Sequence, residues 1–345
     1  MSPAPLLSAR DLRVGFATEG GLLQAVDGVS FDLAAGEVLA IVGESGSGKS
    51  VTAQTILGLT RSPNARIEGS VRLGGEELLD ASEAVLRKVR GERIGMVFQD
   101  PMTSFNPVYR LGAQIVEAIR AHRGDVSKAE ARGRAVELLD SVGIPDAERR
   151  VDDYPHEFSG GMRQRAMIAM ALALEPEVLI ADEPTTALDV TIQAQVLRLL
   201  ERLNRERGVA TILITHDLGV VAEVADRVLV MYAGRVVEEG TLDEIFYDPQ
   251  HPYTWGLLGS LTRLDRPRPK RLPQISGAPP SLLNLPTGCA FRPRCPHEFG
   301  KCSQVPGLEA RLPADPNHRD RCWLTPEQKK TLREVEPGRI GLEEP

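Results

Sequence analysis

The stretch GESGSGKS, residues 43–50, decides the fold of this chain. The apolar run LAIV (residues 39–42) leads into it, and a segment with helical character, SVTAQTILGL (residues 50–59), follows. It fits the pattern G-x-x-x-x-G-K-[ST] at every fixed position, in the strand–loop–helix context that this pattern requires. Glycines let backbone N–H groups point inward with no Cβ in the way, and these groups bind phosphate oxygens together with the helix N-terminus. The segment therefore predicts a phosphate-binding loop rather than a glycine-rich turn that binds nothing.

Two side chains of this loop are expected to act on a bound nucleotide directly. Lys49 can reach the terminal phosphates, and the hydroxyl group of Ser50 can ligate Mg²⁺. The nucleotide-binding residues expected here are Gly43, Glu44, Ser45, Gly46, Ser47, Gly48, Lys49, Ser50 and Val51.

A second motif carries paired carboxylates. In VLIADEP (residues 178–184), an apolar strand ends in Asp182 and Glu183. A strand-end aspartate can hold Mg²⁺ in a phosphate-loop enzyme, and Glu183 is then placed to polarise a water for attack on the γ-phosphate. The alternative is an acidic strand end that merely faces solvent. The phosphate loop elsewhere in the chain argues for the catalytic interpretation.

Short apolar, β-branched runs recur along the chain and predict its strands. They lie at residues 38–42, 94–98, 178–181, 211–215 and 227–232. Continuous apolar strands suit a sheet that is covered on both faces. Helical patterns lie between them, and Ala135, Leu138, Leu139 and Val142 form one apolar stripe. The alternation predicts an α/β fold, with a mostly helical insert over about residues 99–158.

Composition excludes several classes. The 345 residues carry a formal net charge of −7 with 26% charged residues, whereas nucleic-acid binders normally show a basic excess. The longest apolar run, residues 166–174, stops at Glu175, well short of the roughly 20 residues needed to span a bilayer. The N-terminus lacks a secretory signal pattern. The chain is expected in the cytosol, where four cysteines are more typical of thiols or metal ligands than of disulfides.

The segment EFSGGMRQR (residues 157–165) narrows the class of nucleotide enzyme. Ser159, Gly160 and Gly161 precede a nearly all-apolar helix. This is a second glycine-rich helix N-terminus and, by the same reasoning, a second anion site. The guanine-reading Asn-Lys-x-Asp of GTPases is absent from the sequence. Two such sites with one acidic pair indicate that a nucleotide is shared between two chains.

Over roughly residues 7–246, the sequence resembles the ATP-binding subunits of ABC transporters. Their signature is a Leu-Ser-Gly-Gly-Gln pattern, and this chain keeps the Ser-Gly-Gly centre between Phe158 and Met162. Gln99 in VFQDP is similar to the Q-loop glutamine, and the Ala-Leu-Asp at residues 187–189 is similar to the D-loop.

Two further residues extend this resemblance. His216 in ITHD is similar to the switch histidine of the family. Phe16 is similar to the aromatic residue that stacks on adenine, with a plain core phenylalanine as the alternative.

The resemblance implies a fold and a mechanism. The fold is a phosphate-loop ATPase with a mixed-sheet core over residues 1–246, including a helical subdomain at about 100–165. Two subunits close head to tail, with ATP between the phosphate loop of one and residues 159–161 of the other. The implied catalytic residues are Glu183, His216 and Gln99, and the implied Mg²⁺ ligands are Ser50, Gln99 and Asp182. Gln99 is implied to link the γ-phosphate to the helical subdomain, and that subdomain is implied to dock on the membrane subunits.

The chain changes character after about Phe246, where prolines multiply and all four cysteines lie. This predicts a separate C-terminal extension, residues 247–345. The Met variant of the signature and the tail DPQHPYTWGLL (residues 248–258) resemble the ATPase subunits of oligopeptide and dipeptide importers, whose relatives include nickel importers. The resemblance extends to about Leu324, and the last twenty or so residues read as an ordinary charged tail.

Importers of this kind imply a set of partners. They combine two different ATPases, two membrane permeases and an external binding protein, which places this chain on the cytoplasmic face of the membrane as a peripheral subunit, with no nucleic-acid partner. A soluble ABC-type ATPase of DNA repair or translation is a competing class, but these usually carry two cassettes or a long coiled coil. A third class is a redox-responsive module in which the cysteine tail is the main function.

The four cysteines form a candidate metal site, with five, six and nineteen residues between successive members: Cys289, Cys295, Cys302 and Cys322. Four thiolates can hold zinc or an iron–sulfur cluster. The paired C-x₂₋₄-C of zinc sites is absent, so the spacing favours a four-iron cluster, and the subfamily's tail is associated with one. Four unrelated thiols are the alternative.

His297 and His318 lie near enough in sequence to replace one thiolate. Nearby basic residues could offset thiolate charge or be solvated surface: Arg292, Arg294, Lys301, Arg319 and Arg321.

Overall fold

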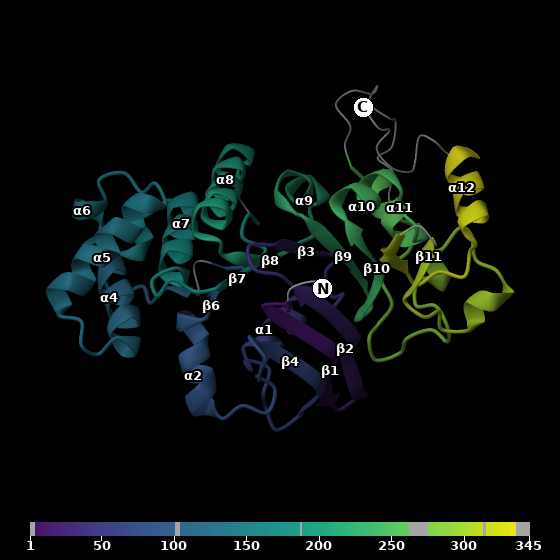
Figure 1. Cartoon of the computed structure of the whole chain (residues 1–345), viewed down its shortest axis with the longest axis horizontal. Coiled ribbons are helices and arrows are strands. Elements are labelled where there is room, and N and C mark those ends of the chain that lie inside the picture. Colours follow the sequence, from purple (N-terminus) through teal and green to yellow (C-terminus); the bar gives the residue numbers. More distant parts are fainter. Residues whose placement is uncertain (1–3, 101–103, 187, 262–274, 313–314, 336–345) are drawn as a thin grey trace. The chain divides into compact units, whose positions relative to one another are not determined.

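The structure is a computed structural model that describes residues 4–100, 104–186, 188–261, 275–312 and 315–335 (Figure 1). The chain divides into two compact units, each assembled from segments far apart in the sequence. The first comprises Met1–Leu7, Leu33–Val38 and Leu73–Ile214, and the second comprises Ser8–Asp32, Leu39–Arg72 and Thr215–Pro345.

The first unit contains three of the predicted apolar strands. Strands β6 (Ile94–Val97), β7 (Val178–Asp182) and β8 (Ala210–Thr215) pair in parallel, with Val178 opposite both Ile94 and Ala210. All residues of β7 are buried, as the continuous apolar pattern predicts for a central parallel strand. Helix α8 (Val190–Arg207) follows β7. Its N-terminus is capped by the Asp189 carboxylate, which accepts from the Ile192 N–H at 3.0 Å.

The same unit holds the helical segment that the sequence predicts. Its elements are α4 (Leu111–His122), α5 (Lys128–Ser141), α6 (Ala147–Arg150), the 3₁₀ turn η1 (Pro155–Glu157) and α7 (Gly160–Ala171), with β5 (Glu76–Glu77) and α2 (Glu83–Glu92) earlier in the chain. A reciprocal cap between Ser127 and Glu130 starts α5, a standard device for satisfying the first N–H groups. The expected apolar stripe is confirmed, because Ala135, Leu138 and Leu139 are buried on α5.

The second unit contains a mixed sheet in the order β11-β12-β10-β9-β3. Its strands are β3 (Val38–Val42), β9 (Arg227–Tyr232), β10 (Arg235–Thr241), β11 (Glu309–Leu312) and β12 (Asp315–Asp320). Strands β3 and β9 pair in parallel, whereas β9 with β10, β10 with β12, and β11 with β12 pair antiparallel. The C-terminal extension thus adds two strands to the edge of this sheet.

Helix α1 (Lys49–Ile56) follows the phosphate loop of the second unit. Helices α9 (Leu218–Val224), α10 (Leu242–Tyr247) and α11 (Pro252–Gly259) contribute buried side chains to a cluster with the strands of this sheet. One apolar cluster joins Val42 and Val230 of the strands to Tyr253 of α11 and to Phe291 of the extension. The cysteine-bearing segment is therefore packed into the same core as the strand that leads to the phosphate loop.

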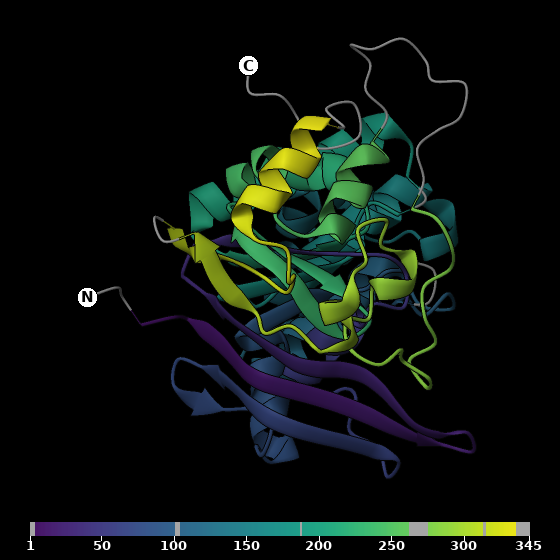
Figure 2. The ribbon, with the colours of Figure 1, turned by 90° about the vertical axis from the view of Figure 1, so that its right-hand side faces the viewer.

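Three long strands of the second unit were not predicted from the sequence. They are β1 (Leu7–Thr18), β2 (Gly21–Leu33) and β4 (Ala65–Leu73), which are neighbours in the order β2-β1-β4 (Figure 2). Their burial alternates instead of forming continuous apolar runs, which is the pattern of strands with one face in contact with solvent.

The end of the described chain is structured, so the expectation of an ordinary charged tail is wrong for this part. The 3₁₀ turns η2 (Arg292–Arg294) and η3 (Gly300–Ser303) precede β11 and β12, and helix α12 (Pro326–Val335) comes after these strands (Figures 1 and 2). The side chain of Lys329 on α12 is fully buried and donates to Asp320 Oδ2 at 2.7 Å. Charged composition misled the sequence argument because a buried ion pair looks like solvated surface in sequence. Within the described ranges, no helix combines the length and apolar character that crossing a membrane requires.

Candidate functional site

The phosphate loop lies between β3 and α1 and is closed in by backbone on two sides. A Cβ atom on Gly43 would lie 2.1 Å from the carbonyl oxygen of Met231, and one on Gly48 would lie 2.3 Å from that of Ala25. Gly48, the N-cap of α1, also has a φ of +100°. Only glycine fits these positions, which explains why the motif fixes them.

Lys49 lies folded back over this loop. Its side chain is 4% exposed, and Nζ donates to the carbonyl oxygens of Gly43 at 2.7 Å and Glu44 at 3.1 Å. The hydroxyl group of Ser47 is also buried and has no hydrogen-bond partner within the described part of the chain. Buried polar groups are rarely left unpaired, so Ser47 and Lys49 fit a loop built to receive anionic oxygens.

The other loop residues differ in exposure and in their partners. Ser45 and Gly46 are exposed, whereas Ser50 and Val51 are half-buried at the start of α1. Glu44 differs from all of these, because its carboxylate pairs with Arg294 and its N–H donates to the Tyr253 hydroxyl group at 2.8 Å. Arg294 and Tyr253 were not expected to contact this loop.

The carboxylate motif lies in the first unit, at the end of β7. Asp182 is 2% exposed. Glu183 follows with a φ of +48°, and its N–H donates to the carbonyl oxygen of Ile214 at 2.8 Å. A left-handed conformation costs a non-glycine residue about 1 kcal/mol or more, and such residues cluster at functional sites.

Two side chains hold the Glu183 carboxylate. Its Oε2 accepts from Gln99 Nε2 at 3.1 Å and from the Thr186 hydroxyl group at 2.8 Å. The structure therefore brings together Gln99 and Glu183, which lie 84 residues apart. The sequence analysis did not identify Thr186 as a partner of Glu183, although it lies only three residues further along the chain.

The signature segment starts α7 with an open N-terminus. Ser159 is the N-cap, and its hydroxyl group accepts from the Met162 N–H at 3.3 Å. Ser159 and Gly160 are exposed, whereas Gly161 is buried, and a Cβ there would lie 2.5 Å from Ile192 Cγ2. An exposed residue at the start of a twelve-residue helix, here Gly160, can offer its N–H group to an anion.

The remaining expected residues lie where the motifs place them along the chain. His216 is exposed in the bend between β8 and α9, and Phe16 is half-buried on β1. Of the D-loop, Ala187 lies outside the described residues, and Asp189 is the cap of α8. Phe16, His216 and the phosphate loop belong to the second unit, and residues 99, 159–161 and 182–183 belong to the first.

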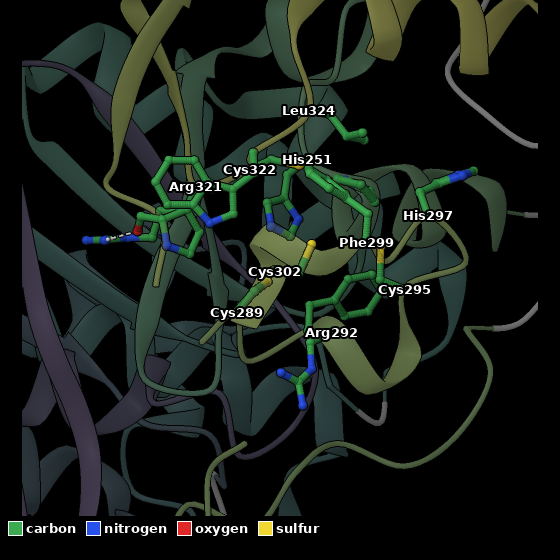
Figure 3. Close-up of a pocket in the computed structure, with 14 residues that line it drawn as sticks. His251, Cys289, Arg292, Cys295, His297, Phe299, Cys302, Arg321, Cys322 and Leu324 are labelled. Carbon is green, nitrogen blue, oxygen red and sulfur yellow. Dashed lines mark hydrogen bonds between the residues drawn. The ribbon is translucent and has the colours of Figure 1, made fainter. Parts of the chain in front are cut away.

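The four cysteines line one pocket in the second unit (Figure 3). They come from separate segments, because Cys289 and Cys295 flank η2, Cys302 lies in η3 and Cys322 follows β12. Burial raises the pKa of Cys289, and it raises the pKa values of Cys295 and Cys322 to about 12 each. These side chains are therefore neutral thiols at neutral pH unless a metal replaces their protons.

The spacing of these sulfurs is wide. Across the described residues, which include all four cysteines, no three of the sulfur atoms lie within 4.8 Å of one another. Sulfurs on one tetrahedral zinc would be about 3.8 Å apart, given a Zn–S distance of about 2.3 Å. The four thiols therefore do not form a preassembled tetrahedral zinc site in this structure.

The histidines near the pocket differ in whether they line it. His297 lines the pocket, but its ring points away from the sulfurs in Figure 3 and packs against Trp255 at 5.5 Å. His318 does not line it, since its Nε2 is 2.9 Å from Glu238 Oε1. His251, which was not singled out from the sequence, lines the pocket and is buried.

The five basic residues near the cysteines also divide. Arg292 and Arg321 line the pocket, but Arg292 Nε pairs with Glu298 at 3.2 Å and Arg321 donates to the carbonyl oxygens of Val236 and Pro306. Arg319 pairs with Glu239, and the Lys301 ammonium lies 4.1 Å from the centroid of the Trp323 ring. Arg294 turns to Glu44 instead.

Comparison with known proteins places the chain in a family. Residues 26–186 match the family ABC transporter, and residues 237–302 match the family Oligopeptide/dipeptide transporter, C-terminal region. The oligopeptide transport ATP-binding protein OppD of Salmonella typhimurium is 55% identical over 89% of this chain and 91% of that protein. The dipeptide transport ATP-binding protein DppD of Bacillus subtilis is 53% identical over 92% of this chain and 94% of that protein.

A solved structure extends the comparison to the fold. The ATP-binding cassette MJ0796, a dimer in a post-hydrolysis state bound to ADP and Pi, is 30% identical with a TM-score of 0.62, over 68% of this chain and 98% of that chain. The expected phosphate-loop ATPase fold is thereby confirmed. OppD and DppD, which are 55% and 53% identical to this chain over 89% and 92% of its length, show its family. The chain belongs to the ATP-binding proteins of the ABC transporter family, in the group that carries the oligopeptide/dipeptide transporter C-terminal region.

Proposed function

We propose that this chain hydrolyses ATP to power the import of oligopeptides or dipeptides through an ABC transporter. The observation that carries this proposal is the match of residues 237–302 to the Oligopeptide/dipeptide transporter, C-terminal region. Relatives named for oligopeptide and dipeptide transport cover about nine-tenths of the chain and agree with it. No comparable observation favours nickel as cargo, or a role in DNA repair or translation.

The phosphate loop supplies the electrostatic part of the proposed reaction. Lys49 and the loop N–H groups bind the β- and γ-phosphates, and Ser47 adds a buried hydroxyl donor. Ser50, Gln99 and Asp182 provide oxygen ligands suited to Mg²⁺, which supplies charge neutralisation when bound. Phe16 is the proposed aromatic contact for adenine.

The acidic motif supplies the proposed base. Glu183 polarises the attacking water, in an orientation set by Gln99 and Thr186. His216 contacts the γ-phosphate. Residues 159–161 act on the nucleotide held by a second ATPase subunit, a role supported by the exposed positions of Ser159 and Gly160 at the N-terminus of α7.

The proposed assembly is peripheral to the cytoplasmic face of the membrane. We infer a second, non-identical ATPase, two transmembrane permeases and an external substrate-binding protein as partners. The helical subdomain that includes α4 and α5 is the proposed docking region for the permeases, with Gln99 reporting the γ-phosphate to it. Peptide selectivity resides in the permeases and the binding protein.

Uptake in cells tests the cargo. Cells that carry Glu183→Gln in place of the wild-type subunit should lose uptake of radiolabelled di- and oligopeptides and retain nickel uptake. Gentle detergent purification of the wild type should recover two permeases and a second ATPase. If the variant loses nickel uptake but keeps peptide uptake, the proposed peptide cargo is wrong. If DNA or ribosomes are recovered instead of permeases, the transporter assignment is wrong.

For the cysteine pocket we propose a [4Fe–4S] cluster held by Cys289, Cys295, Cys302 and Cys322. The support is the convergence of four thiols on one pocket, whose lining also includes Arg292 and Arg321. Cysteines are the usual ligands of such clusters. A tetrahedral zinc ion is the alternative, which the same four residues could hold after closing inward.

Anaerobic purification of the full chain tests this assignment. Iron and acid-labile sulfide should be recovered at about four atoms of each per chain, as expected for a cubane cluster. Variants with single cysteine-to-serine changes should lose both together. A colourless, zinc-containing protein would replace the cluster with zinc, and a metal-free protein with unchanged folding would leave four unrelated thiols.

A further inference from the structure

Glu44, the second residue of the phosphate loop, is bound by an arginine 250 residues away in the chain. Arg294 Nη1 donates to Glu44 Oε2 at 2.5 Å, and Nη2 donates to Oε1 at 2.9 Å. The Arg294 side chain is 4% exposed and that of Glu44 is 27% exposed. This is a bidentate, largely desolvated ion pair, the strongest class of hydrogen-bonded contact between side chains.

Aromatic groups fix Arg294 in this position. Its guanidinium carbon lies 5.8 Å from the centroid of the Tyr232 ring and 6.0 Å from that of Phe291. Nη1 also donates to the Tyr232 hydroxyl group at 3.3 Å. An arginine guanidinium group stays protonated in proteins, so Arg294 carries its charge in this ion pair.

The backbone of the loop is held from the same side. The N–H of Glu44 donates to the hydroxyl group of Tyr253 at 2.8 Å, and Tyr253 is fully buried in α11. Tyr253 packs against Tyr232 and Phe291, with ring centroids 4.6 and 5.4 Å away. Both the main chain and the side chain of Glu44 are therefore tied to one aromatic cluster, made of Tyr232, Tyr253 and Phe291.

The charge of Glu44 makes the ion pair matter for nucleotide binding. A carboxylate in a loop that binds a triphosphate would repel the ligand, since like charges at short range disfavour one another. Arg294 compensates that charge through its two hydrogen bonds to the carboxylate. Loss of Arg294 should therefore weaken the binding of an anionic ligand to this loop.

The arginine is also part of the cysteine pocket's framework. Arg294 lies in η2, the short turn between Cys289 and Cys295. In this turn the Arg292 N–H donates to the Cys289 carbonyl oxygen at 3.0 Å, and the Cys295 N–H donates to the Arg292 carbonyl oxygen at 3.2 Å. A metal group held by both cysteines would fix the two ends of this turn.

We propose that Arg294 is a positioning residue for ATP binding, which holds Glu44 of the phosphate loop and makes the affinity for ATP depend on occupancy of the cysteine pocket. The first part of this proposal, that Arg294 holds Glu44, depends only on the contacts described above. The occupancy half rests on the metal group proposed above.

A charge cycle in the full chain tests the ion pair. Arg294→Gln should weaken binding of a fluorescent ATP analogue about tenfold, because it leaves an unpaired carboxylate beside the anion site. Adding Glu44→Gln should restore most of the affinity, which a merely structural role for Arg294 would not do. The matched control is Arg333→Gln, which breaks the ion pair with Asp248 in the same unit and should leave affinity unchanged. Unaltered affinity in Arg294→Gln, or no rescue in the double variant, would overturn the proposal.

Removal of the metal tests the occupancy half. Stripping the purified wild-type chain with a chelator should lower affinity for the same analogue to about the level of Arg294→Gln, and stripping Arg294→Gln should have no further effect. Circular dichroism checks that each sample remains folded, and Cys302→Ser gives a second route to a depleted pocket. Unchanged affinity on stripping would refute the coupling. A chain purified without metal would refute the metal proposal and the coupling, while the charge cycle would still decide the ion pair.

Discussion

The side-chain amide of Gln99 lies 3.1 Å from Oε2 of Glu183, and the same oxygen accepts from the Thr186 hydroxyl group at 2.8 Å. One carboxylate oxygen is therefore held by two donors, while the backbone of Glu183 lies in the left-handed region. Such convergence on a strained residue is expected where orientation matters for chemistry. It makes Glu183 the first residue to test.

We expect Glu183→Gln to lower the rate of ATP hydrolysis by at least about 100-fold, because the amide keeps the shape but cannot act as a base. ATP binding should persist, so the variant should remain dimeric or assembled in the presence of ATP. Phosphate release measures the first effect, and size-exclusion chromatography with and without ATP measures the second.

The control for this experiment is another carboxylate of the same unit. Glu177 pairs with Arg93 at 2.7 Å and has a side chain 45% exposed. Glu177→Gln should hydrolyse ATP at the wild-type rate. Turnover in Glu183→Gln equal to that of this control would remove Glu183 from the proposed mechanism.

Lys49→Ala should weaken ATP binding at least about tenfold, since the ammonium group is expected to contact the terminal phosphates. In the structure this group donates to the carbonyl oxygens of Gly43 and Glu44, so it already lies at the loop. Calorimetric titration with MgATP gives the affinity. Lys88→Ala, which changes an exposed lysine on α2, is the control. Equal affinity in the two variants would contradict the phosphate-loop interpretation.

Local patterns predicted most of the strands and part of the site. The continuous apolar runs became β3, β6, β7, β8 and β9 because buried parallel strands need apolar side chains on both faces. The glycines of the phosphate loop were predictable because only glycine fits against the carbonyl oxygens of Met231 and Ala25. Both cases depend on constraints that act within a short segment.

Contacts between distant segments were not predictable in this way. The pairing of Glu44 with Arg294 spans 250 residues, and neither residue has a sequence neighbour that indicates its partner. Sequence analysis left Arg294 as a possible countercharge for thiolates, whereas the structure places its charge at the phosphate loop. Likewise, Lys329 reads as a solvated tail residue until β12 places Asp320 against it.

Lys329→Ala should destabilise the protein strongly. It removes the partner of Asp320 from a site where both side chains are at most 1% exposed. A buried charge left without its partner costs about 3–5 kcal/mol in unfolding free energy. Urea unfolding followed by circular dichroism measures this change in the full chain.

The adjacent lysine offers a matched control. Lys330 faces solvent with a side chain 74% exposed and lies 4.0 Å from Glu334, so Lys330→Ala should cost less than about 1 kcal/mol. A similar cost for both variants would mean that α12 does not depend on the buried pair. Lys329→Ala with Asp320→Asn should recover part of the loss, because the second change removes the uncompensated charge.

The buried pair of His318 and Glu238 predicts a pH-dependent contribution to stability. Burial alone would lower the pKa of His318, but the hydrogen bond and charge of Glu238 raise it above its ordinary value of 6.5. Burial alone would raise the pKa of Glu238, but His318 and other donors together hold it below its ordinary value of 4.5. The contribution of His318 is thus fully present below pH 6.5 and is lost as pH rises through its raised pKa. That of Glu238 is lost as pH falls below 4.5.

Comparison of the wild type with His318→Gln separates this pair from the rest of the protein. The difference in unfolding free energy should be largest between about pH 4.5 and 6.5 and should shrink as the pH rises through the raised pKa of His318, because the neutral imidazole no longer attracts the carboxylate. Urea titrations across this range supply the measurement, and His156→Gln, at an exposed position in η1, controls for general effects of losing a histidine. A difference that stays constant from about pH 5 to 9 would show that His318 acts through packing and not through its charge.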